Sequence, residues 1–145
     1  MKTIVLAILL SMLMISSAVA RDSLGNYSVK EALAQKAAQT KLSGDVSFYF
    51  GKSKHGKVIK NYGTVNTNKK TNSFNKSDKE ACQWVFLSAM IALEESAVSQ
   101  GGNAVINIKS NYKSKLHSSN SSFQCGAGAL MAGVALEGTI VKIKK

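Results

Sequence analysis

The segment that decides the fold is SDKEACQWVFLSAMIALEESAVSQGGNAVINIKSNY, residues 77–112. Ser77 and Glu80 form a capping box, in which a serine at a helix start is followed three residues later by glutamate. The GG pair in this segment supplies the helix end. Apolar residues recur between the two signals at helical spacing, which predicts one long, largely buried helix. Its packed path runs through Ala81, Trp84, Val85, Ser88, Ile91, Ala92 and Glu95. We expect Trp84 to anchor the core rather than to stack against a ligand.

Two strands are predicted to follow this helix. The first covers residues 104–112, with Ile106, Ile108, Ser110 and Tyr112 on one side and Val105, Asn107 and Lys109 on the other. The second covers residues 130–142 and places Val134, Leu136 and Ile140 opposite Ala135, Thr139, Val141 and Ile143. Gly133 and Gly138 in this last strand indicate bulges or a close approach of another backbone.

The glycine-rich segment CGAGALMAGVAL, residues 125–136, fails as a phosphate loop. Gly128 and Gly133 have the spacing of such a loop, but Val134 and Ala135 stand where it needs lysine and Ser/Thr. The segment is also too short for a membrane span, which takes about 20 residues. We therefore expect a loop around Cys125 that runs into the last strand.

The first half of the chain predicts a second helix. Residues 21–27 look like a flexible lead-in. Ser28 and Glu31 form another capping box, and alanine-rich periodicity continues to Leu42 before Gly44.

A hairpin is predicted next. DVSFYF (45–50) and KVIKNYGTV (57–65) are typical of strands, and the glycine-containing residues 51–57 between them indicate a turn. The polar segments 66–76 and 113–124 are predicted to be loops.

The N-terminus is typical of a secretory signal peptide. Lys2 gives a positive start, residues 3–15 carry no charge, and the small residues 18–20 suit cleavage after Ala20. Cleavage leaves 125 residues (145 − 20), the size of one domain. The alternative is a membrane anchor, for which the apolar run is short. We expect a periplasmic or secreted protein with no transmembrane segment after cleavage.

The chain beyond residue 20 is strongly basic, with a net charge of +10 from 18 basic and 8 acidic residues. All the basic residues except Arg21 are lysines. This argues against sequence-specific nucleic-acid recognition, which favours the arginine fork, and suits loose attraction to anionic surfaces. Candidate anion-binding residues are Lys52, Lys54, Lys57, Lys60, Lys69 and Lys70, with solvated surface as the alternative. Candidate ligand-binding residues are Tyr49, His55 and Tyr62.

The chain contains two cysteines, Cys82 and Cys125. An even count in an exported chain is most simply explained by one disulfide. The alternative is a metal site that adds His55 or His117, although no CxxC or HxxxH spacing supports it. We expect neither a bound metal nor a cofactor.

Catalytic patterns are missing from the sequence. Both histidines lie in predicted loops, and no GxSxG motif occurs. Glu94 and Glu95 lie near the end of the long helix without a histidine at metal-binding spacing. We therefore expect a protein that is not an enzyme, and a small hydrolase is the minor alternative.

The sequence resembles the YbjQ-like family, in which an alanine- and leucine-rich helix leads into a GA-[DN]-A-V-[VI] strand and the chain ends in GTxVK. The matching residues are Gly102–Ile106 and Gly138–Lys142. It also resembles small exported proteobacterial proteins with FYFG, an AC.W.F helix start and a C.AGA.MAGVAL.G ending. Those proteins are often labelled "excinuclease ATPase subunit", an activity that an exported chain without a Walker motif cannot supply.

The resemblance implies an α+β domain over residues 45–145. In it, the long helix packs on one face of a small antiparallel or mixed sheet, and residues 21–44 add the lead-in and N-terminal helix. The family is related in fold to the disulfide-bonded Rcs envelope-stress sensor, so the resemblance also implies a Cys82–Cys125 disulfide between the helix and the final strand.

These features favour a soluble, non-catalytic binding or envelope-interaction protein. Its expected partners are an envelope protein or an anionic surface, and oligomers are compatible with the family. The alternative is a metal or polyanion binder, with nucleic acid or lipopolysaccharide held by the lysine-rich segment.

Overall fold

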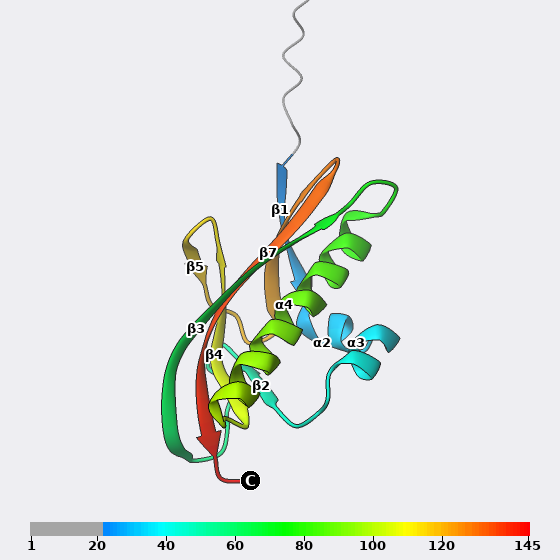
Figure 1. Cartoon of the computed structure of the whole chain (residues 1–145). Helices are drawn as coiled ribbons and strands as arrows, with labels where there is room; N and C mark the ends of the chain where they lie inside the picture. Colours follow the sequence, from blue (N-terminus) through cyan, green and yellow to red (C-terminus); the bar gives the residue numbers. More distant parts are fainter. Residues whose placement is uncertain (1–21) are drawn as a thin grey trace, which may run out of the picture.

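The computed structural model describes residues 22–145, so the predicted signal peptide lies outside the described residues. In chain order the elements are β1 (Asp22–Ser28), α2 (Val29–Leu33), α3 (Lys36–Lys41), β2 (Ser47–Phe50), β3 (Val58–Asn72), α4 (Asp78–Gln100), β4 (Ala104–Tyr112), β5 (Lys115–His117), β6 (Ser122–Gly128) and β7 (Met131–Ile143). The fold is α+β, as predicted, with α4 lying across one face of a mixed sheet (Figure 1).

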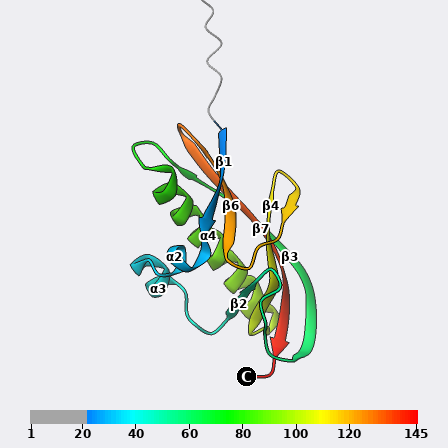
Figure 2. The same cartoon turned by 180° about the vertical axis from the view of Figure 1, so that it is seen from behind.

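The sheet has seven strands and is larger than the small sheet predicted. Its centre is β7, which pairs along its length with β3 on one edge. On its other edge β7 pairs first with β6 and then with β4. β1 extends the sheet beyond β6, and β2 and β5 both pair with β4 (Figure 2). The β2–β4 pair is parallel and the other pairs are antiparallel.

The predicted ends of α4 are confirmed. The Ser77 hydroxyl accepts a hydrogen bond from the Glu80 backbone N–H at 3.1 Å, which satisfies an amide that has no partner inside the helix. Gly101 ends the helix in the left-handed region, at φ 84°, where glycine carries no steric penalty.

The packed face of α4 differs from the predicted path. The buried side chains include Cys82, Phe86, Ala89, Leu93 and Ala97, which recur at three- and four-residue spacing. Trp84 is 45% exposed, so the prediction that it anchors the core is wrong. Two residues along a helix correspond to about 200° of rotation, so Trp84 points away from the face that holds Cys82.

The core lies between α4 and the sheet. Phe86 of α4 stacks on Phe123 of β6, with ring centroids 4.0 Å apart. The predicted division of β7 is confirmed: Val134, Leu136 and Ile140 belong to this core, whereas Val141 and Ile143 belong to a smaller cluster on the other face.

A bulge in β4 overturns the predicted alternation of that strand. Asn107 has φ 54°, and the register with β7 shifts between Ile106 and Lys109. The extra residue places Val105 and Ile108 together in the main core, instead of on opposite sides. Gly138 lies across from this bulge, where an added Cβ would be 2.6 Å from Val105 Cγ1. The crowding at Gly138 therefore comes from buried side chains and not from another backbone as predicted, and at Gly133 the nearest atom to an added Cβ is 3.6 Å away.

Several predicted loops are strands. The lead-in is β1, which pairs with β6, and residues 66–72 continue β3 along β7. Parts of segment 113–124 form β5 and the start of β6, and Cys125 lies within β6 rather than in a loop.

Two further predictions about the first half of the chain are wrong. The single helix over 28–42 is two short helices, because Gln35 between them has an extended backbone. The predicted hairpin does not form: β2 pairs with β4, and β3 pairs with β7.

Candidate ligand-binding groove

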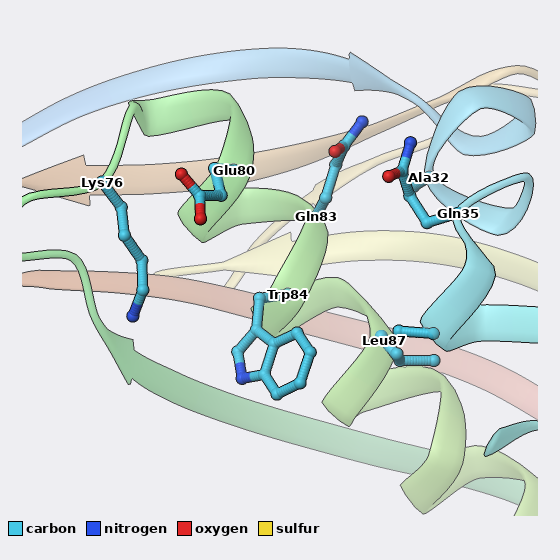
Figure 3. A pocket seen from close by; sticks show the side chains of 8 residues that line it. Ala32, Gln35, Lys76, Glu80, Gln83, Trp84 and Leu87 are labelled. Atoms are coloured by element: carbon cyan, nitrogen blue, oxygen red, sulfur yellow. The ribbon is translucent and has the colours of Figure 1, made fainter. Parts of the chain in front are cut away.

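A groove of about 460 Å³ separates the α2–α3 segment from the first half of α4. It is lined by Ala32, Gln35, Ala37, Lys76, Glu80, Gln83, Trp84 and Leu87. Gln83 and Trp84 project from α4, and Gln35 comes from the α2–α3 segment (Figure 3). The groove therefore lies between two elements that are far apart in the sequence.

The capping boxes position both walls of the groove. Ser28 caps α2 by accepting from the Glu31 backbone N–H at 3.1 Å, just as Ser77 caps α4. An ion pair between Lys79 of α4 and Glu31 of α2 links the two helix starts. Surface ion pairs contribute little stability, so this one adds only weakly to the placement of the two walls.

The chemistry of the groove combines an aromatic ring, two amides and an apolar floor. The Lys41 Nζ lies 4.6 Å from the centroid of the Trp84 ring, a cation–π contact. The amide groups of Gln35 and Gln83 can each donate and accept hydrogen bonds, and Ala32 and Leu87 supply apolar surface. Such a site can hold a ligand with both a hydrogen-bonding backbone and an apolar group.

Of the three predicted ligand-binding residues, the structure brings together only Tyr49 and His55. Their ring centroids are 5.7 Å apart in an edge-on arrangement. Tyr62 lies on the opposite face of the sheet, packed against the main core, and its hydroxyl donates to the Gly101 carbonyl at 3.2 Å.

The six candidate anion-binding lysines are exposed but lie in two groups. Lys52, Lys54 and Lys57 belong to the segment before β3, close to Lys60 near its start. Lys69 and Lys70 lie near the other end of β3. Nine residues of strand separate Lys60 from Lys69, which corresponds to about 30 Å. No compact ligand can therefore contact both groups.

Sequence reasoning missed a second hollow, of about 590 Å³, on the face of the sheet away from α4. Its rim contains Asp22, Tyr112 and Lys113, with a Lys113 Nζ–Asp22 Oδ2 distance of 2.5 Å. Tyr112 lies against β6, where a Cβ on Gly126 would be 1.9 Å from its hydroxyl oxygen. Asn111 and Tyr112 at the end of a predicted strand did not indicate this hollow, because Tyr112 meets Asp22 of β1 and Gly126 of β6 only in the folded sheet.

The contacts within this trio shift the pKa values of all three groups. The hydrogen bond from Lys113 lowers the pKa of Asp22, and the same bond raises the pKa of Lys113. Burial raises the pKa of Tyr112, and the negative charge of Asp22 adds to the effect. A lowered carboxyl pKa and raised lysine and tyrosine pKa values leave all three groups in their ordinary charge states near neutral pH, so the trio offers no acid or base near pH 7.

The disulfide between Cys82 and Cys125 is present, with Cα atoms 5.9 Å apart. It joins α4 to β6, the strand before the final one, instead of α4 to the final strand. Both residues are fully buried, and a disulfide of this kind fits an oxidising compartment. The alternative in which the two cysteines ligate a metal is therefore wrong.

Glu94, one of the two acidic residues near the end of α4, has a structural role. The Glu94 carboxylate is buried and accepts hydrogen bonds from the Ser43 backbone N–H at 3.1 and 3.2 Å. It thereby fixes the chain after α3. Within residues 22–145, no group of three His, Cys, Asp or Glu side chains is arranged to hold a metal ion.

Among the described residues, α4 alone is long and apolar enough to cross a membrane by length and composition. In this structure 56% of its most apolar window is buried inside the protein, and its fully buried Cys82 is bonded to β6. These observations are those of a core helix.

No protein-family model and no curated protein matches the sequence. Among solved structures, the chain is similar to a protein of unknown function from Pediococcus pentosaceus that belongs to the DUF74 family. The two share 15% sequence identity with a TM-score of 0.46, over 70% of this chain and 100% of the other.

Proposed function

We propose that the protein is an exported, periplasmic binding module without catalytic activity, and that the Trp84 groove takes an extended segment of an envelope protein. The observation that carries this proposal is the 45%-exposed Trp84 in a groove between two capped helices. The buried disulfide and the signal-peptide pattern support export. The resemblance to small exported proteobacterial proteins supports the same compartment.

A polypeptide fits the groove better than a uniformly charged ligand. The rim carries both signs of charge, because Lys76 and Glu80 line the groove and Lys41 lies over the Trp84 ring. Glutamine amides such as Gln35 and Gln83 can pair with both the N–H and C=O groups of an extended chain. The apolar floor can then receive one side chain, and an exposed tryptophan is a frequent anchor at protein interfaces.

The proposal is tested by photo-crosslinking in living cells. A benzoylphenylalanine residue at Gln83 should give a discrete adduct with an envelope protein. The same residue at Gln100, which is exposed at the far end of α4, serves as the matched control and should not. Adding Trp84→Ala should remove the Gln83 adduct, because the anchor is lost.

Affinity is then measured with the purified partner. Isothermal titration calorimetry suits this measurement, because Trp84 is the only tryptophan in the chain and its removal would also remove a tryptophan fluorescence signal. We expect Trp84→Ala to weaken binding by about 30-fold, the effect of losing an anchor worth roughly 2 kcal/mol. Equal adducts from both positions, an adduct with glycan alone, or turnover of a substrate by the purified protein would each contradict the proposal.

A further inference from the structure

Three chain segments meet at one end of the molecule: the start of β1, the β6–β7 turn and the β3–α4 loop (Figure 1). The Ser73 backbone N–H donates to the Leu130 carbonyl at 2.8 Å, and the Ser73 hydroxyl donates to the Gly128 carbonyl at 2.9 Å. Gly128 also pairs with Asp22. These contacts hold the two loops together, and we refer to the three segments as the basic apolar end.

Large apolar side chains project from the tips of this end. Phe74 in the β3–α4 loop is 61% exposed and Leu130 in the β6–β7 turn is 65% exposed, with exposed Met131 beside it. Single exposed apolar residues are ordinary, but three on two loops that are hydrogen-bonded to each other form a patch. These exposed side chains make little contact with the core, so they are free to contact an external surface.

The same end carries an excess of positive charge. Lys69, Lys70 and Lys76 are exposed and make no ion pair with a carboxylate within residues 22–145. Cleavage after Ala20 would add Arg21 and its α-amino group next to Asp22. Asp78 and Glu80 lie nearby in the first turn of α4, where the positive end of the helix dipole offsets them.

We propose that the basic apolar end docks on the surface of an anionic lipid bilayer. Phe74, Leu130 and Met131 enter the interface, and the lysines contact lipid phosphates. A soluble polyanion would use the charge and leave the apolar tips in water, so a bilayer accounts for both features.

Vesicle co-sedimentation of the purified, disulfide-bonded chain 21–145 tests the proposal. We expect binding to phosphatidylcholine vesicles that contain phosphatidylglycerol and little binding to phosphatidylcholine alone. Binding should fall between about 0.01 M and about 1 M NaCl, as the screening length shrinks from about 30 Å to about 3 Å.

Matched variants separate this end from the rest of the surface. Lys69→Gln with Lys70→Gln should weaken binding by about 25-fold, since each lysine near an anionic surface contributes about five-fold. The control pair is Lys144→Gln with Lys145→Gln, two exposed lysines at the opposite end. Phe74→Ser with Leu130→Ser should weaken binding by at least about ten-fold. Their control is Ile59→Ser with Val98→Ser, residues 63% and 56% exposed at the start of β3 and in the last turn of α4.

The outcomes discriminate clearly. If the Phe74→Ser, Leu130→Ser variant binds vesicles as well as its control variant, docking through this end is overturned. In that case, an equal loss of heparin binding and vesicle binding in the Lys69→Gln, Lys70→Gln variant would indicate that this end binds a soluble polyanion. Trp84→Ala should leave vesicle binding unchanged, so failure of the groove proposal and failure of membrane docking are separable. Thermal unfolding of every variant identifies any loss that is due to misfolding.

Discussion

At the scale of single residues, Thr67 of β3 is a polar group without a partner. Its hydroxyl is buried and makes no hydrogen bond within residues 22–145. A buried unsatisfied group costs about 1–3 kcal/mol, and valine has nearly the same shape as threonine. We expect Thr67→Val to raise the free energy of unfolding by about 1 kcal/mol in urea denaturation. Thr64→Val, at an exposed position of the same strand, is the control and should change it by less than about 0.5 kcal/mol. A destabilised Thr67→Val protein would show that the hydroxyl has a partner in solution.

Gly138 gives a second prediction at this scale. An alanine Cβ would lie 2.6 Å from Val105 Cγ1 and 3.2 Å from Ile108 Cγ1, both stiff buried side chains. Because neither can move away freely, we expect Gly138→Ala to lower the free energy of unfolding by about 1–3 kcal/mol. In Gly133→Ala the nearest atom is 3.6 Å away, an ordinary contact, so this variant should be close to neutral. Equal effects of the two substitutions on the urea midpoint would argue against the close approach at the bulge.

Residue-scale errors in the sequence analysis share a physical cause. The bulge at Asn107 follows from how β4 meets β7, and nothing local to "VINIK" marks it. Trp84 is apolar and lies on a helix, so composition alone places it inside. Its exposure depends on which of several apolar stripes of α4 faces the sheet. The candidate groove could not be predicted for the same reason, because its tryptophan was assigned to the core.

At the scale of elements, local sequence signals predicted the helix starts correctly, but they did not predict which strands pair. The capping boxes at Ser28 and Ser77 are contained within four residues, so the helix starts could be read directly. Strands β1 and β3 contain long polar runs because they lie at the edges of the sheet, each paired along one side only. Their partners β6 and β7 lie about 60 to 100 residues further along the chain, and no local pattern reveals them.

The disulfide ties two of these elements together and yields the third prediction. It closes a segment of 43 residues between α4 and β6. In the chain-entropy model such a cross-link is worth about 4 kcal/mol. Cys82→Ala with Cys125→Ala should therefore lower the free energy of unfolding by about that amount, a large share of the roughly 5–15 kcal/mol typical of a domain. Urea denaturation of the variant and of the reduced wild type checks this, and unchanged midpoints in both would contradict it.

At the scale of the whole molecule, the fold class was predictable because α4 and β7 dominate it. Both are long and rich in apolar residues, and the two faces of β7 were assigned correctly from alternation alone. The distribution of charge was not predictable. The six candidate lysines all lie between residues 52 and 70 of the sequence. Strand β3 nevertheless places Lys60 and Lys69 near its opposite ends. The groove and the basic apolar end must therefore be tested as separate sites. Both proposals also depend on export of the protein.

Export and oxidation together give the final prediction. If the chain is secreted, the full-length protein with a C-terminal tag should be recovered from the periplasm or medium, begin at Arg21 by N-terminal sequencing, and show no free thiol after denaturation. The chain 21–145 made without the first 20 residues should stay in the reducing cytoplasm, where disulfides rarely persist, and should show both thiols of Cys82 and Cys125 free. The cytoplasmic form should also unfold at lower urea concentration, since it lacks the cross-link between α4 and β6. An uncleaved N-terminus in the membrane fraction would instead support the anchor alternative, and the basic apolar end would then face the membrane through a permanent tether.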